Sequence, residues 1–177
     1  MIYIITGPSG VGKNTIINEL SNHLDFYFSV SHTTRPRRDN EIDGKDYYFI
    51  TEDEFENLIN SDQMLEYEQY GEFYYGTSKE ELSNDSSIII LDLEVNGATK
   101  LLKEDNNFKG IFIDIDDYEL INRLKNRGHD ANFIKKRMKL ANLQREKKEL
   151  YQYHVDNEDI KTSVNQILDI IYELEES

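Results

Sequence analysis

The sequence predicts an α/β fold, in which a parallel sheet flanked by helices carries a small mixed α/β insertion and a pair of charged helices. Three observations support this prediction. The apolar run at 2–6 is followed by a glycine-rich turn and then by residues with helical spacing. Apolar runs typical of strands buried on both faces alternate with helical patterns along the second half of the chain. Residues 45–76 contain short aromatic runs separated by turn signals, as expected of short antiparallel strands.

The turn after the first strand has the composition of a phosphate-binding loop. It consists of Gly7, Pro8, Ser9, Gly10, Val11, Gly12, Lys13, Asn14 and Thr15. Its G-x4-G-K spacing lets backbone N–H groups and a helix N-terminus bind phosphate, while the lysine reaches the terminal phosphates of a nucleotide. Asn14 stands where this motif usually has a hydroxyl that binds Mg²⁺. A tight strand-to-helix connection is the alternative, but the full spacing favours a nucleotide, and a triphosphate fits its charge pattern.

Length and composition fit one domain with a single core. The chain has 177 residues, a formal charge of −15 and no cysteine. The acidic balance opposes binding to nucleic acid, and the lack of cysteine excludes disulfides and thiolate metal sites. No basic segment precedes a long apolar run, and no run approaches about 18 apolar residues. We therefore expect a cytoplasmic protein without a signal peptide or a membrane span, and nothing indicates an obligate protein partner.

Individual elements follow from the spacing of the apolar residues. In the first half we expect helices at 13–23 and 52–60 and strands at 26–31, 46–50, 64–70 and 73–75. In the second half we expect strands at 87–92, 109–115 and 153–155 and helices at 95–103, 117–127, 132–151 and 160–174. The short strands in the first half predict a small antiparallel excursion from the α/β core.

Several charged residues outside the glycine-rich turn have two interpretations each. Arg35, Arg37 and Arg38 lie in a polar loop and are either a solvated patch or a bidentate grip on phosphate. Asp92, at the end of a buried strand, either holds metal-bound water or caps the following helix. The basic residues of 117–151 form either a solvated face or a mobile lid over phosphates.

Taken together, these segments resemble the guanylate kinase family, whose members have a P-loop kinase core and transfer the terminal phosphoryl group of ATP to GMP with Mg²⁺. The similarity covers nearly the whole chain, in blocks at 7–15, 29–35, 44–47, 65–67, 74–77, 90–92, 123–128, 136–138 and 155–157. The resemblance implies a single domain, 1–177, in three parts. These are a core at about 1–31, 83–122 and 141–177, a GMP-binding insertion at about 32–82 and a helical lid at about 123–140.

The same resemblance implies roles for individual residues. The ATP phosphates would be bound by Lys13 and the loop 7–15, with Asn157 beside the adenine. The GMP phosphate would be bound by Ser31, Arg35, Arg38, Tyr47 and Tyr75, and guanine by Glu66 and Thr77. Glu94, which replaces an aspartate usual in the family, would lie near guanine or metal. The catalytic residues would be Lys13, Arg35, Arg123, Arg127 and Arg137. Thr15 and Asp92 would bind Mg²⁺, partly through water.

Two other functions remain open at this point. A related phosphate-loop kinase acting on another small phosphorylated acceptor would keep Lys13 but would not need Glu66 and Thr77. A non-catalytic guanylate-kinase-like binding module would typically lack the intact loop and the lid arginines, both of which this chain has. The sequence leaves open the use of dGMP as well as GMP.

Overall fold

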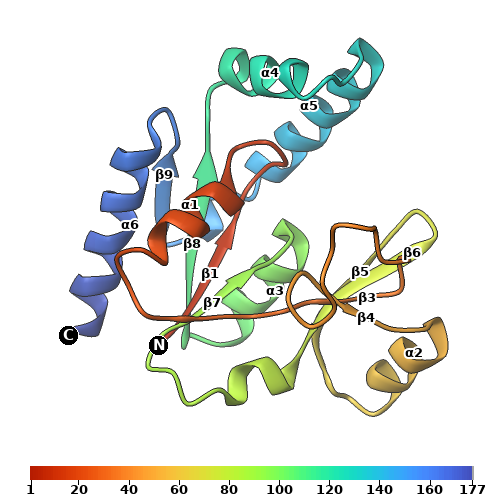
Figure 1. Ribbon diagram of the computed structural model, residues 1–177. Helices are drawn as coiled ribbons and strands as arrows, with labels where there is room; N and C mark the ends of the chain where they lie inside the picture. Colours follow the sequence, from red (N-terminus) through yellow and green to blue (C-terminus); the bar gives the residue numbers. More distant parts are fainter. Residues whose placement is uncertain (177) are drawn as a thin grey trace. The chain divides into compact units, whose positions relative to one another are not determined.

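The computed structural model describes residues 1–176, so Ser177 lies outside the described residues. The chain forms two compact units (Figure 1). The first unit comprises Met1–Phe26 and the chain from Leu91 onward, and the second is Tyr27–Ile90. Strand β7 crosses the boundary between them, because it runs over Ile89–Asp92.

The main sheet is a parallel five-stranded sheet with the order β2-β7-β1-β8-β9. Its strands are β1 (Ile2–Thr6), β2 (Tyr27–Phe28), β7, β8 (Phe108–Asp114) and β9 (Tyr153–Asp156). The helices of the first unit are α1 (Lys13–Leu20), α3 (Val95–Glu104), α4 (Asp117–Asn126), α5 (Ala131–Arg145) and α6 (Ile160–Glu175), with a short 3-10 helix at Lys148–Leu150. The alternation of strands and helices predicted from the sequence is confirmed in this unit.

The core of the first unit forms around β1 and β8, which pair in parallel from Ile2↔Phe108 to Thr6↔Phe112. Ile4, Ile5 and Phe112 are fully buried, as expected of strands covered on both faces. Helices α1 and α6 contact each other through amphipathic faces whose buried positions recur at helical spacing, such as Ile167 and Ile171 in α6.

The second unit contains a four-stranded sheet with the order β4-β3-β6-β5 (Figure 1). The strands are β3 (His32–Thr33), β4 (Tyr48–Phe49), β5 (Met64–Tyr70) and β6 (Phe73–Ser78), followed by a 3-10 helix at Lys79–Ser83. Helix α2 (Glu52–Asn60) begins at a capping box, in which Thr51 and Glu54 each satisfy a backbone N–H group of the other. Phe55 of this helix is fully buried and packs into the interior of the unit.

Three predicted elements were wrong in detail. The strand expected at 26–31 is limited to Tyr27–Phe28, and the next strand, at His32–Thr33, belongs to the other sheet. The chain leaves the main sheet near Val30, whose N–H donates to the buried Glu81 carboxylate at 2.6 Å. The excursion has four strands, of which β3 and β4 are parallel, so it is a mixed sheet. The long helix expected to reach residue 151 ends at Arg145. No helix in the described part of the chain is long and apolar enough to cross a membrane.

Candidate functional site

The glycine-rich loop follows β1 and ends at the first residue of α1. Gly7, Gly10 and Gly12 all have positive φ angles, of 146°, 101° and 103°. A Cβ on Gly7 would lie 2.0 Å from the carbonyl oxygen of Ile113, so only glycine fits this close approach to the end of β8. The loop therefore has the backbone geometry of an anion-binding nest at a helix N-terminus. Asn14 and Thr15, in the first turn of α1, are exposed.

Lys13 lies between the loop and Asp92. Its Nζ donates to the carbonyl oxygen of Gly7 at 3.0 Å and lies 3.9 Å from Asp92 Oδ1. Burial raises the pKa of the Asp92 carboxyl; the neighbouring Glu94 adds to this rise, and Lys13 opposes it. The N-cap of α3 is Glu94 and not Asp92, so the helix-cap interpretation of Asp92 was wrong. A role in holding metal-bound water stays a prediction.

Arg123 and Asn157 both bind the back of the loop through Val11. Asn157 Nδ2 donates to the Val11 carbonyl at 2.7 Å, and Arg123 Nη1 donates to the same oxygen at 3.0 Å. Arg123 also donates to the carbonyl oxygen of Asn157 at 2.9 Å and to Glu119 at 3.0 Å. The structure therefore brings both residues to the loop, where they hold its backbone. Contact of either side chain with ATP stays a prediction.

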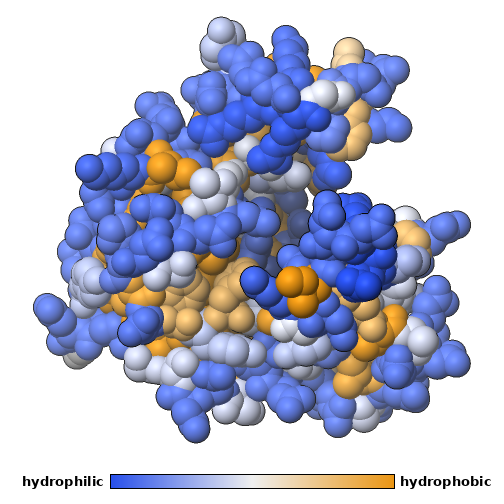
Figure 2. All heavy atoms as spheres, viewed as in Figure 1, coloured by the Kyte–Doolittle hydropathy of each residue, from blue (hydrophilic) through white to orange (hydrophobic). Residues whose placement is uncertain are grey.

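Arg127 and Arg137 lie farther along the hairpin formed by α4 and α5. Arg127 is the exposed C-cap of α4, and Arg137 lies over the ring of Phe133 at 4.9 Å. His129 stacks on the same ring at 4.0 Å. Neither arginine forms an ion pair with another described residue. Figure 2 shows hydrophilic side chains covering this hairpin at the top of the view.

In the second unit, Glu66 and Thr77 are direct cross-strand partners in β5 and β6. A β-bulge between Met64 and Glu66 makes this pairing possible, because regular pairing from Met64↔Ser78 would place Leu65 opposite Thr77. Directly opposed residues of an antiparallel pair project to the same face of the sheet. Ser31 reaches the same place, with its Oγ 3.2 Å from the hydroxyl of the buried Thr77.

Arg35 is surrounded by aromatic rings and by one acid. Its guanidinium lies 5.6 Å from the ring centres of both Tyr47 and Phe49, and Tyr47 contacts Tyr75 edge-on. Glu41, which was not predicted to belong to the site, accepts two hydrogen bonds from Arg35, at 2.7 and 3.0 Å. An acid six residues after Arg35 in the same arginine-rich loop was the available signal. Arg38 is exposed, and its backbone N–H donates to Glu41 at 2.9 Å.

A cavity of about 450 Å³ lies in the second unit, on the other side of its sheet. Its lining includes His32, Tyr48 and Ser78. Successive side chains of a strand point to opposite faces, so these residues face away from Ser31 and Thr77. The cavity is therefore separate from the predicted base-binding residues. Glu94, also predicted to lie near guanine, is in the first unit, where it is exposed and accepts a hydrogen bond of 3.4 Å from Gln144.

Comparison with known proteins identifies one family. The family model for guanylate kinase matches residues 1–174. The guanylate kinase of Oceanobacillus iheyensis is 38% identical over 97% of this chain and 86% of that protein, and the one from Enterococcus faecalis is 38% identical over 97% and 87%. A crystal structure of guanylate kinase from Anaplasma phagocytophilum, 28% identical, superposes with a TM-score of 0.78 and covers 98% of this chain and 85% of that one.

Proposed function

Because this chain belongs to the guanylate kinase family, we propose that it transfers the terminal phosphoryl group of ATP to GMP, giving ADP and GDP. The observation that carries this proposal is the intact glycine-rich loop with Lys13 at the start of α1, in a chain that the family matches almost from end to end. The family match also favours GMP over the other phosphorylated acceptors left open above.

In this proposal the second unit binds GMP. The side chains of Arg35 and Tyr75 both contact the ring of Tyr47. Together with Ser31 and Arg38, these three residues would bind the phosphate of GMP. Glu66 would accept hydrogen bonds from the N1–H and N2 amine of guanine. The Thr77 hydroxyl, opposite Glu66, would meet the guanine O6 acceptor or its neighbour. The same contacts would suit dGMP, since none of them needs the ribose 2′-hydroxyl.

The first unit would bind ATP and perform the transfer. The amides of the loop 7–15 and Lys13 would hold the ATP phosphates, Asn157 would lie beside the adenine, and Glu94 would lie near guanine or metal. The acceptor is already an anionic phosphate oxygen, so the reaction needs no covalent intermediate and no strong base. Catalysis then consists of aligning two anions, excluding water and neutralising the charge that spreads during transfer. Arg35, Arg123, Arg127 and Arg137 would supply that neutralisation together with Lys13.

We further propose Mg²⁺ as the metal of this reaction. Within residues 1–176, no group of three or more acidic or histidine side chains could hold a metal ion. Mg²⁺ usually keeps several waters and binds one or two protein oxygens together with substrate phosphates, so it does not need such a group. The partly buried carboxylate of Asp92 and the exposed hydroxyl of Thr15 are the oxygens we assign to it, partly through water. The ion would neutralise charge on the phosphates.

The compact second unit, Tyr27–Ile90, supports a GMP-binding insertion at about 32–82 within a core at about 1–31, 83–122 and 141–177. The hairpin of α4 and α5 supports a lid at about 123–140. We place the protein in the cytoplasm, with which its lack of cysteine is compatible.

A coupled assay with ATP and Mg²⁺ against a panel of nucleoside monophosphates tests the proposed activity. We expect GMP to be used with a kcat/KM at least about 100-fold above that of AMP, CMP or UMP, since a buried polar site rejects bases that leave it unpaired. Preference for another acceptor, or no phosphoryl transfer to any of them, would contradict the proposal.

A further inference from the structure

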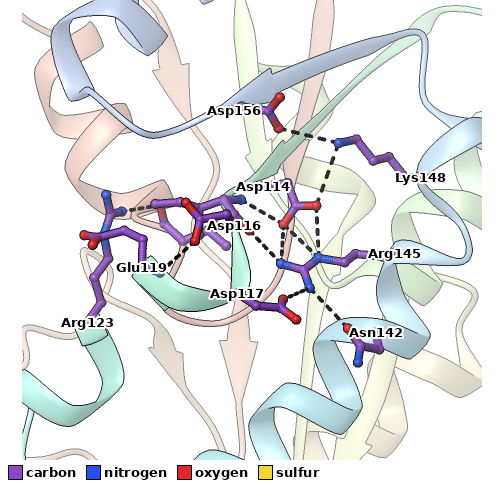
Figure 3. A network of polar contacts seen from close by, with 11 residues as sticks. Asp114, Asp116, Asp117, Glu119, Arg123, Asn142, Arg145, Lys148 and Asp156 are labelled. Carbon is purple, nitrogen blue, oxygen red and sulfur yellow. Dashed lines mark hydrogen bonds and ion pairs between the residues drawn. The ribbon is translucent and has the colours of Figure 1, made fainter. Parts of the chain in front are cut away.

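Arg145, the last residue of α5, has all of its guanidinium nitrogens engaged (Figure 3). Its Nε donates to both carboxylate oxygens of Asp114 at 3.0 Å, and its Nη2 donates to the carbonyl oxygen of Ile115 at 2.7 Å. Its Nη1 donates to Asp117 at 2.5 Å and to Asn142 at 3.1 Å. With no unsatisfied nitrogen, Arg145 is a structural arginine, unlike Arg127 and Arg137 on the same hairpin.

The partners of Arg145 lie where the chain enters and leaves the hairpin. Asp114 is the last residue of β8, and Asp117 is the first residue of α4. Lys148, which follows α5, lies 3.7 Å from Asp114 and 3.6 Å from Asp156, the last residue of β9. We call residues 114–117 and 145–148 the hairpin base. Figure 3 shows Arg145 and Lys148 converging on the carboxylate of Asp114, a residue that is only 7% exposed, while Asp117 contacts Arg145.

The hairpin base is directly connected to the phosphate loop. The residue before Asp114 is Ile113, whose carbonyl oxygen is the close neighbour of Gly7. The backbone carbonyl of Asp114 accepts the N–H of Asn157 at 2.8 Å, and the Asn157 side chain in turn holds Val11 of the loop. Arg145 is therefore linked to the loop through the C-terminal end of β8 and through Asn157.

The two helices of the hairpin are held in different ways. The side of helix α4 contacts the loop. The side chains of Leu120 and Leu124 would be the nearest neighbours of a Cβ on Gly10, and Arg123 donates to the carbonyl oxygen of Val11. For α5, the ion pairs are at its C-terminal end, and Arg137 lies two turns earlier, about 12 Å along the axis. Helix α5 also packs on α4, with Ile134 and Ala141 buried, so the ion pairs of Arg145 fix the C-terminal end of the helix that carries Arg137.

We propose that Arg145 is a positioning residue that fixes the base of the hairpin, so that Arg137 is held in the correct place to meet the phosphates during transfer. This inference rests on the proposed function. Arg145 itself touches no substrate and acts through α5. A purely stabilising ion pair would also explain its contacts, so the test must separate turnover from stability.

The test uses the neutral pair Asp114→Asn/Arg145→Gln, because Arg145→Gln alone leaves a buried, poorly paired carboxylate and reduces stability for that reason. The pair is made in the wild-type chain and in an Arg137→Ala chain, and kcat, both KM values and Tm are measured. Lys161→Gln, which removes an exposed charge from α6, outside the hairpin, is the control, and we expect its kcat to be unchanged.

We expect the neutral pair to keep a Tm close to that of the wild type, to lower kcat about 10-fold and to leave the KM for GMP unchanged. In the Arg137→Ala chain the same pair should lower kcat by less than about 2-fold, because its target is already gone. Equal fold losses in both chains, or a wild-type kcat for the pair, would overturn the proposal.

A second measurement is independent of activity and of the stability of the pair. In Arg145→Lys, which keeps the charge but loses the guanidinium fork, amide hydrogen exchange without ligand should be faster in 131–145 than in the wild type, with β1 and β8 unchanged. Unchanged exchange in 131–145 would overturn the positioning role. If the wild-type protein phosphorylated no GMP, the proposed function would be refuted. The hydrogen-exchange rates of 131–145 would still decide whether Arg145 positions the hairpin.

Discussion

The Glu41 carboxylate and the Arg35 guanidinium form a two-point ion pair, with donor–acceptor distances of 2.7 and 3.0 Å. The backbone N–H of Arg38 donates to the same carboxylate at 2.9 Å. Glu41 thus holds the loop that carries both arginines and fixes the orientation of Arg35 between Tyr47 and Phe49. An arginine that is oriented before its ligand arrives loses less entropy on binding phosphate.

The first prediction concerns this orientation. Glu41→Gln should raise the KM for GMP about 10-fold, since an amide has only one acceptor oxygen and holds Arg35 less firmly. The KM for ATP should not change. Steady-state kinetics with each substrate varied in turn measures both values, and Asp39→Asn, an exposed acid of the same loop, is the control. A lower KM for GMP in Glu41→Gln would show instead that Glu41 competes with the phosphate.

The second prediction is the pH dependence of the same pair. Hydrogen bonds from the Arg35 side chain and the Arg38 backbone lower the pKa of the Glu41 carboxyl to about 2, from an ordinary value of 4.5. A carboxyl whose pKa is lowered by folding contributes its stability above the unfolded pKa and loses it as pH falls through the folded one. The urea midpoints of wild type and Glu41→Gln should therefore differ at pH 6 and converge towards pH 2. A constant difference over this range would contradict the assigned pKa shift.

The third prediction concerns Lys13. Lys13→Met keeps the aliphatic stem of a side chain that is only 15% exposed, and it removes the charge that we propose to bind the ATP phosphates. We expect kcat to fall by about 100-fold or more, because a preorganised cation stabilises the transferring phosphoryl group in the transition state. The fold, checked by circular dichroism and Tm, should survive. Near-normal turnover would contradict the assignment of the loop.

The fourth prediction separates two glycines. Gly7→Ala should reduce the free energy of unfolding by about 2–4 kcal/mol, because its Cβ would overlap the Ile113 carbonyl and its φ angle is unfavourable for alanine. Gly71 also has a positive φ angle, but a Cβ there would meet nothing within 4 Å. Gly71→Ala should therefore reduce the free energy of unfolding by only about 1 kcal/mol. Denaturant unfolding of the two variants measures the difference, and similar values would mean that the loop can move away from β8.

Local sequence signals predicted much of this fold. The glycine spacing of the phosphate loop, the apolar runs of β1 and β8 and the helical spacing of 52–60 all depend on residues close together in the chain. The break between β2 and β3 could not be predicted in this way, because it depends on Glu81, which lies 51 residues from Val30. The C-terminal end of α5 likewise coincides with contacts between Arg145 and a strand end 31 residues away.

The site was predicted less completely than the fold, for the same physical reason. Lys13 and Arg35 could be singled out from their segments and Glu66 from the resemblance to the family, and their roles stay predictions. The partner of Arg35, Glu41, could not, since nothing in the loop sequence shows which acid folds back onto which arginine. The pairing of Glu66 with Thr77 depends on the bulge at Leu65, and a shift of one residue would have turned Glu66 to the other face of the sheet.

The last prediction tests base choice through that pairing. Guanine presents N1–H and the N2 amine side by side, so one carboxylate can accept both hydrogen bonds, whereas adenine has no such donor pair. Glu66→Gln places an amide NH₂ against one of these donors and removes the charge. We expect kcat/KM for GMP to fall about 100-fold, while the value for AMP changes less than about 3-fold and the KM for ATP is unchanged. Glu72→Gln, an exposed acid in the turn between β5 and β6, controls for the loss of charge. Equal losses with GMP and AMP would mean that Glu66 supports the sheet or the phosphate site and does not recognise the base.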